Sequence, residues 1–164
     1  MKKLLLQNLE YPFELIGTDW MLITAGDKNK FNTMTASWGT LGVLWNKKIA
    51  TCFVRPQRYT FEFIEKQNYF SLSFFNSSYK DALKLCGTKS GRDIDKVKET
   101  GLTPCFEESA PYFSEAHTTL VCKKIYSDFI SPKCIIDKSI ESNYQNKDYH
   151  KMYIGEIIKC VVKE

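Results

Sequence analysis

The chain has 164 residues, the usual size of one domain with its own hydrophobic core. Its formal charge of +4 comes from Lys and Arg scattered among Asp and Glu, so it has no basic block of the kind that holds nucleic acid. No stretch of about twenty apolar residues is present to cross a bilayer, and residues 1–8 turn polar too early for a secretory signal. We therefore expect one cytoplasmic domain over residues 1–164, with neither nucleic acid nor membrane as a partner.

Aromatic residues make up 14% of the chain, with 11 Phe and 9 Tyr, an enrichment typical of β-sheet. The apolar segment 16–25 ends at turn residues in 26–30 and resumes at Phe31, which predicts a hairpin. Further strands are expected over 48–54, 69–75, 120–125 and 153–162.

The 69–75 segment carries the clearest strand pattern. Phe70, Leu72 and Phe74 alternate with Ser71 and Ser73, so the apolar and polar side chains point to opposite faces. This strand should therefore bury its phenylalanines.

Short helices are expected between the strands. The 60–67 segment begins at Thr60, which can act as an N-cap. The 78–87 segment begins at Ser78, carries an apolar stripe and ends at Gly87, which can take the left-handed C′ conformation.

A further helical turn over 93–100 should stop at Gly101. Several short strands with intervening helices, and no regular βαβ alternation, favour a mainly β protein built as an antiparallel barrel with helical decorations.

The run from Asn32 to Gly39 alternates small hydroxyl residues with Met and ends in Trp-Gly. It offers many backbone and hydroxyl donors with little side-chain bulk, a surface that suits a flat heteroaromatic ring with polar edges. The alternative is an ordinary edge strand with a buried Trp.

Downstream, a strand end carries Arg55 and Arg58 into the helix start at Thr60. Helix N-termini present unpaired N–H groups, and guanidinium groups bind phosphate oxygens in pairs, so a phosphate monoester could dock there. The alternative is that both arginines are solvated surface charges and that Thr60 is only a cap.

A third candidate is the stretch from Gly87 to Asp93, in which two glycines bracket Thr88, Lys89 and Ser90. Its chemistry resembles an anion-binding nest, although it lacks the residue order of a nucleotide triphosphate loop.

Cysteine and histidine give no metal or catalytic motif. No two of the six cysteines stand in a C-x-x-C spacing, and several lie in apolar runs, so we interpret them as reduced core residues. His117 and His150 stand far apart and outside any metal-binding pattern. We expect no metal.

These segments, in this order, resemble the flavin reductase-like family, a group with an FMN-binding split barrel that includes flavoredoxin. The end of the chain is also similar to the closing strand of the family, in which a His precedes a Gly-Glu pair. The matching stretches are 32–38, 55–60, 90–96, 101–104 and 150–157.

The resemblance implies a Greek-key FMN-binding split barrel with short flanking helices, assembled as a homodimer with one flavin near each subunit interface. It places the isoalloxazine ring along Asn32, Thr33, Met34, Thr35, Ala36, Ser37 and Trp38. It places the phosphate near Val54, Arg55, Pro56, Arg58 and Thr60, assisted by Lys89, Ser90, Gly91 or Arg92. His150 is implied near the nicotinamide or flavin pocket, as the one candidate for a catalytic residue.

The implied activity is hydride transfer from NAD(P)H to FMN and on to an unknown electron acceptor. Two alternatives remain: an FMN-binding electron carrier of the flavoredoxin kind, reduced by a protein partner, and a small aromatic barrel that binds nucleic acid. The polar segment between residues 126 and 152 departs from the family pattern, and its role is left open.

Overall fold

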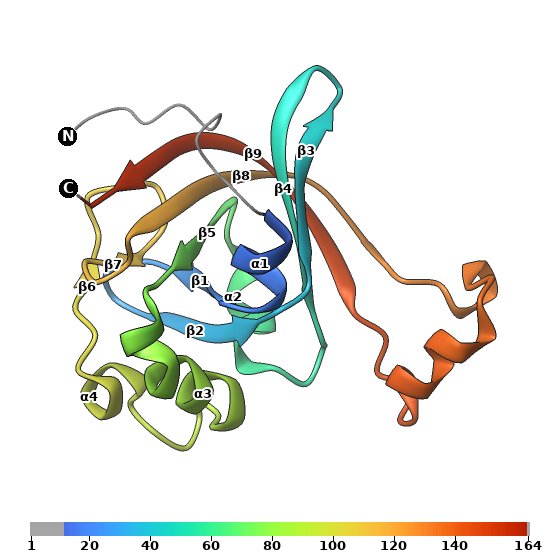
Figure 1. Cartoon of the computed structure of the whole chain (residues 1–164), viewed down its shortest axis with the longest axis horizontal. Helices are drawn as coiled ribbons and strands as arrows, with labels where there is room; N and C mark the ends of the chain where they lie inside the picture. The colour runs from blue at the N-terminus through green and yellow to red at the C-terminus, as the bar shows by residue number, and fades with distance from the viewer. Residues whose placement is uncertain (1–11, 164) are drawn as a thin grey trace.

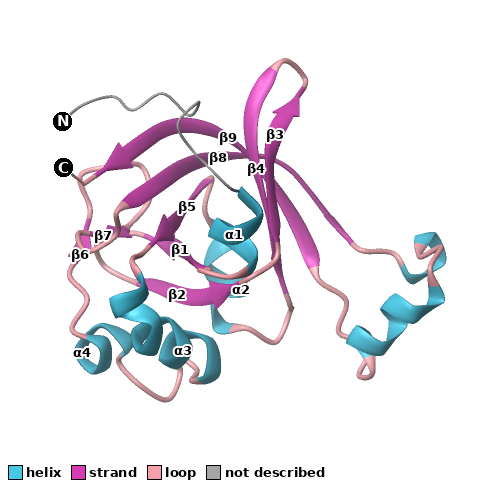
Figure 2. Ribbon diagram, in the orientation of Figure 1, coloured by secondary structure: helices cyan, strands magenta, loops and turns pink. Residues whose placement is uncertain are grey.

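A computed structural model describes residues 12–163, which form a mainly β structure (Figures 1 and 2). Seven antiparallel strands make one sheet. In sheet order they are β2 (Phe31–Ala36), β1 (Met21–Gly26), β5 (Tyr69–Phe74), β8 (Thr118–Phe129), β9 (Lys151–Val162), β4 (Lys47–Val54) and β3 (Gly39–Leu44).

The connection between β2 and β3 makes the sheet curl into a barrel. These strands lie at opposite edges of the sheet, yet only Ser37 and Trp38 separate them in the chain. Three peptide steps span at most about 11 Å, so the two edges must approach one another at this link. We call the link formed by Ser37 and Trp38 the seam.

Short helices surround the barrel (Figure 1). They are α1 (Pro12–Gly17), α2 (Tyr59–Lys66), α3 (Lys80–Thr88) and α4 (Lys96–Thr100), with 3-10 turns at Ser77–Tyr79, Pro132–Cys134 and Lys138–Tyr144. A small two-stranded sheet pairs β6 (Pro104–Cys105) with β7 (Tyr112–Phe113). None of the helices in residues 12–163 has the length and hydropathy that a membrane span requires.

Alternation along the strands divides the apolar side chains between two cores. In β1, Met21 and Ile23 point into the barrel, whereas Leu22 packs on the outside with Leu83 and Cys86 of α3. In β5 the expected alternation is confirmed for the phenylalanines, which lie in the barrel core. Its serines are also fully buried, because the opposite face is covered as well.

Several predicted strand boundaries were wrong. Ile16 lies in α1, and Trp20, with a φ of 70°, separates this helix from β1. Strand β8 runs to Phe129, well beyond the predicted 120–125. Strand β3 was not predicted, because most of its residues are at least partly exposed and carry no apolar alternation.

Three predicted helix caps were also wrong. The N-cap of α3 is Tyr79, and Ser78 lies in the 3-10 turn that precedes this helix. The N-cap of α2 is Arg58, and Thr60 lies within the first turn with its side chain fully buried. Gly87 lies inside α3, which continues to Thr88. The predicted stop at Gly101 is confirmed: this residue has a φ of 69° and donates its N–H to the carbonyl of Val97.

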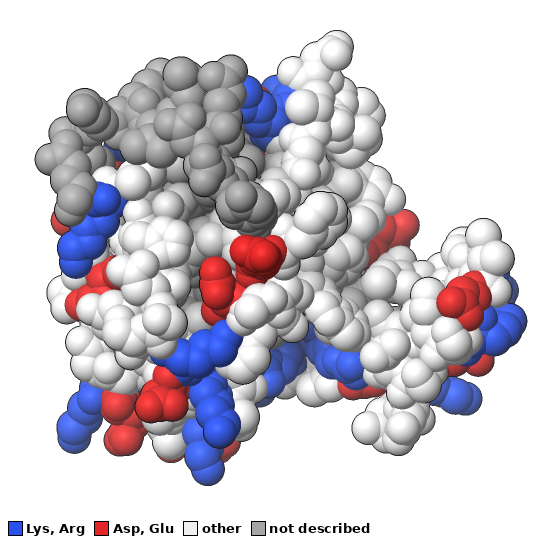
Figure 3. Space-filling model, viewed as in Figure 1, with Lys and Arg blue, Asp and Glu red and all other residues white. Residues whose placement is uncertain are grey.

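Two features project from the barrel (Figure 1). One is the β3–β4 hairpin, whose turn residues Trp45 and Asn46 both have positive φ, as a tight hairpin turn requires. The other is residues 130–150, which leave at the end of β8 and return at the start of β9; we call this segment the arm. On the face shown in Figure 3, basic and acidic side chains are interspersed.

Candidate functional site

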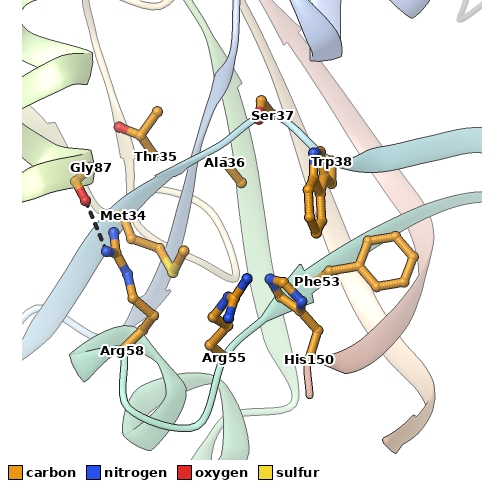
Figure 4. A pocket seen from close by; sticks show the side chains of 10 residues that line it. All are labelled: Met34, Thr35, Ala36, Ser37, Trp38, Phe53, Arg55, Arg58, Gly87 and His150. Carbon is orange, nitrogen blue, oxygen red and sulfur yellow. Dashed lines mark hydrogen bonds between the residues drawn. The ribbon is translucent and has the colours of Figure 1, made fainter. Parts of the chain in front are cut away.

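A cavity of about 260 Å³ lies at the seam, where the two edges of the barrel approach. Figure 4 shows Trp38 on one side of it, with Arg55 and His150 pointing in from the opposite side. We call it the ring cavity. Its lining residues are Met34, Thr35, Ala36, Ser37, Trp38, Phe53, Arg55, Arg58, Gly87 and His150.

The predicted run from Asn32 to Trp38 separates into two parts. Met34 to Trp38 line the ring cavity. Asn32 and Thr33 are buried and do not line it: Asn32 Nδ2 donates to Thr60 Oγ1 at 2.8 Å, and the hydroxyls of Thr24 and Thr33 are 2.9 Å apart. The hydroxyl of Thr60 is therefore already held by β2.

A second cavity of about 180 Å³ adjoins the first, because Met34 and Arg58 line both. It is formed by the start of α2, the end of α3 and the loop after α3. We call it the anion cavity. Its other lining residues are Asn32, Gln57, Tyr59, Thr60, Thr88, Lys89, Ser90, Gly91 and Lys96.

The two arginines of the predicted phosphate motif are held differently. Arg55 forms an ion pair with Asp148 and donates to the backbone carbonyl of Asn143 at 2.8 Å, so it is tied to the arm. Arg58 donates to the carbonyl of Gly87 at 2.8 Å (Figure 4). Burial lowers the pKa of Arg58, and repulsion from Arg55 lowers it further.

Lys96 is a site residue that the sequence analysis missed. Only 6% of it is exposed, and its Nζ donates to the carbonyls of Thr33 at 2.7 Å and Cys86 at 2.8 Å. Burial and repulsion from Arg58 lower its pKa to about 8, although Cys86 opposes this shift. The matching stretch 90–96 includes Lys96 and excludes the exposed Lys98, but it assigned Lys96 no role in the site.

The loop predicted to form an anion nest is divided between cavities. Lys89, Ser90 and Gly91 line the anion cavity. Arg92 lines a neighbouring hollow of about 600 Å³. There it forms an ion pair with Glu62 and stacks over the ring of Tyr59, with Cζ 4.6 Å from the ring centroid.

Two further predicted residues lie next to the site without lining it. Val54 is fully buried in the barrel core. Pro56 lies in the turn that Arg58 N closes on the carbonyl of Arg55 at 3.0 Å. Neither is among the residues that line the two cavities.

The anion cavity has the chemistry that a phosphate group requires. Lys96 is a buried cation and Arg58 a partly buried one, and among the ion pairs of residues 12–163 neither has a carboxylate partner. The start of α2 has no side-chain cap, and Tyr59 and Thr60 of its first turn line this cavity. A bound anion would compensate both features. Residues 12–163 contain no cluster of His, Cys, Asp and Glu that could hold a metal.

Comparison with solved structures finds chains of the same fold. The chain aligns over its full length with 77% of the flavoredoxin from Methanosarcina acetivorans, with 23% identity and a TM-score of 0.72. It also covers 77% of a split barrel protein from Shewanella frigidimarina, with 96% of this chain aligned, 19% identity and a TM-score of 0.70. For the NADH:FAD oxidoreductase of Streptomyces globisporus, 89% of this chain aligns with 75% of that one, at 17% identity and a TM-score of 0.66.

These similarities confirm the split-barrel fold that the sequence analysis predicted. None of the curated proteins matches the chain. A family model described as the flavin reductase like domain, however, matches residues 13–164. Because this match spans nearly the whole sequence, the chain belongs to the flavin reductase-like family.

Proposed function

We propose that this protein is an FMN-dependent oxidoreductase that takes a hydride from NAD(P)H and passes the electrons to an acceptor. The observation that carries the proposal is the pair of adjoining cavities: one has small residues and an aromatic wall, and the other has a buried and a partly buried cation that have no carboxylate partner within residues 12–163. Their chemistry matches the two ends of a phosphorylated flavin. The flavin, when bound, supplies the hydride-accepting ring.

The residues of the chain would bind and orient this group. Met34 to Trp38 offer a surface with little side-chain bulk for the ring, and Arg58 and Lys96 supply positive charge for the phosphate. Lys89, Ser90 and Gly91 would complete the phosphate site, since they line the same cavity.

Anaerobic stopped-flow mixing of the FMN-loaded protein with NADH, and separately with NADPH, tests the activity. We expect loss of flavin absorbance near roughly 450 nm within about a second with at least one of them. Retention of the yellow colour with both nucleotides would contradict a reductase.

The second candidate is an FMN-binding electron carrier reduced by a protein partner. One of the similar structures is named a flavoredoxin and another an NADH:FAD oxidoreductase, so similar folds are found under both names. If neither nucleotide reduces the bound flavin but dithionite does, the carrier is the better assignment.

We also propose that the protein works as a homodimer. The β3–β4 hairpin supports this, because it exposes apolar side chains at a sheet edge: Val43 is 75% exposed and Trp45 57% exposed. Light scattering during size-exclusion chromatography should give twice the mass of one chain. The mass of a single chain would contradict the proposal.

A further inference from the structure

The arm, residues 130–150, contributes to the wall of the ring cavity. It projects from the barrel and returns to it just before β9 (Figure 1). Its last residue, His150, lines the ring cavity and is only 8% exposed. The ring of His150 lies 5.1 Å from that of Trp38, between centroids, and 6.5 Å from that of Phe53. The arm therefore places a titratable group where a flavin ring would lie.

Tyr144 holds this histidine from the arm side. Its hydroxyl lies 3.0 Å from His150 Nδ1, and the two rings meet edge to face at a centroid distance of 5.6 Å. Tyr144 is itself 5% exposed and stacks on Tyr149, with centroids 4.6 Å apart. The Nδ1 atom is thus occupied, and Nε2 is the ring nitrogen left for the cavity.

The need of the Tyr144 hydroxyl for an acceptor decides the direction of its hydrogen bond to His150. Within residues 12–163, Nδ1 of His150 is the one hydrogen-bond partner found for the Tyr144 hydroxyl. If Nδ1 carried the proton, the buried phenol proton would have no acceptor, an arrangement that costs about 1–3 kcal/mol. Burial also raises the pKa of Tyr144, so the phenol keeps its proton. Tyr144 therefore donates to Nδ1, and His150 carries its proton on Nε2.

The charges around His150 keep it neutral. Burial and then repulsion from Arg55 lower its pKa to about 4, against an opposing effect of Asp148. Arg55 comes from the link after β4 and Asp148 from the arm, and these two form an ion pair. The guanidinium of Arg55 also lies 5.3 Å from the centroid of the Tyr144 ring.

We propose that Tyr144 is a positioning residue that fixes His150 as the neutral Nε2–H tautomer, so that this N–H donates to an acceptor atom of the ring bound in the cavity. The identity of that ring rests on the proposed function, whereas the tautomer does not. In this state His150 is a hydrogen-bond donor and cannot act as a general base through Nε2. The arm is then a part of the site, and this gives a role to most of the segment 126–152, whose role the sequence left open.

Nitrogen-15 NMR of the histidine side chains tests the tautomer directly, on the whole chain at pH 7 without flavin. The chain has 2 histidines, so a His117→Gln variant assigns the signals. We expect His150 as a single tautomer with the proton on Nε2, and Tyr144→Phe should mix the tautomers while leaving His117 unchanged. A proton on Nδ1 in the wild type, or identical spectra for Tyr144→Phe, would overturn the proposal.

A second measurement tests the donor role. Adding FMN to the wild type should shift the Nε2 signal of His150, and an unchanged signal in a flavin-saturated sample would refute donation to the ring. His150→Gln, which retains an N–H at the side-chain end, should bind FMN about fivefold more tightly than His150→Ala, the ratio for a neutral hydrogen bond. Equal affinities would also refute it. If no FMN binds, the proposed function fails while the tautomer result stands.

Discussion

The two cavities differ in how their cations are balanced. At the ring cavity, Arg55 is paired with Asp148, and His150 is held neutral. At the anion cavity, Arg58 and Lys96 bond only to backbone carbonyls in the described part of the chain. Apart from Arg58, which lines both cavities, the charges at the ring cavity are therefore balanced, whereas the anion cavity carries unbalanced positive charge.

This difference shows how one groove can receive a ligand with two unlike ends. A neutral wall accepts a flat uncharged ring without a desolvation penalty for free charge. Burial disfavours the charged forms of Arg58 and Lys96 and lowers both pKa values, and repulsion lowers them further, from Arg55 on Arg58 and from Arg58 on Lys96. A phosphate monoester, which carries about −1.5 to −2 charges at pH 7, would relieve that repulsion.

The largest expected effect comes from removing the charge of Arg58. Arg58→Ala should weaken FMN binding by roughly 10- to 150-fold, since a charge-assisted hydrogen bond contributes about 1.5–3 kcal/mol. Riboflavin, which lacks the phosphate, should lose much less affinity, because only the part of Arg58 that lines the ring cavity can affect it. Fluorescence titration with both flavins measures the two affinities.

Arg55→Ala is the matched variant at the other end. Because Arg55 lies with the ring cavity, its loss should change the affinities for FMN and riboflavin by the same factor. If instead Arg55→Ala weakens FMN selectively, the phosphate lies closer to Arg55 than the comparison of the two cavities predicts.

Gly91→Ala should destabilise the fold at the anion cavity, because there is no room for a side chain at this position. A Cβ at Gly91 would overlap Oδ1 of Asn32, which is fixed by its bond to Thr60. We expect the free energy of unfolding to fall by about 1–3 kcal/mol, as for other overpacking substitutions. Urea denaturation measures this loss. Gly42→Ala is the control, since nothing lies within 4 Å of its Cβ position; an equal loss there would exclude the steric explanation.

The charge of Lys96 should give FMN binding a distinctive pH dependence. The pKa of Lys96 is about 8 in the ligand-free protein, and a bound phosphate favours the charged form and raises it. Affinity for FMN should therefore begin to fall between pH 7 and 8, where the free protein starts to lose this proton, and fall steeply as the pH rises above 8.

Lys96→Met should lower FMN affinity roughly tenfold at pH 7 and abolish the fall above pH 8. Titrations with FMN and riboflavin across pH 7 to 10 measure both effects. Riboflavin should show no such fall with either protein. A decline that persists in Lys96→Met would assign the titration to another group.

Arg92→Ala should have the smallest effect. Arg92 and Glu62 form an exposed ion pair, with side chains 44% and 47% exposed, and such pairs contribute only about 0–1 kcal/mol. FMN affinity should stay within roughly threefold of the wild type. A loss as large as that of Arg58→Ala would place Arg92 at the phosphate.

The sequence predicted the parts of the fold whose signal is local. The alternation of β5 and the stop at Gly101 depend on side-chain periodicity and on one backbone angle, and both are confirmed. Strand β3 lacked such a signal because it lies at an edge with most side chains exposed. The cap at Thr60 was wrong because tertiary contact with Asn32 overrides its local preference.

The site was predictable only as a set of segments. The motifs of β2, the β4–α2 link and the loop after α3 do come together around adjoining cavities. The ion pair of Arg55 with Asp148 could not be predicted, because the two residues are 93 positions apart in the chain. The burial of Lys96 could not be predicted either, because it resembles an ordinary helical lysine. Burial, which separates a structural cation from a binding one, is a property of the folded chain.

Parallel titration of the wild-type protein with FMN and riboflavin tests the central claim most directly. If the cavity beside Arg58 and Lys96 holds the flavin phosphate, FMN should bind at least about tenfold more tightly than riboflavin. Equal affinity for the two flavins, or binding of neither, would contradict the account.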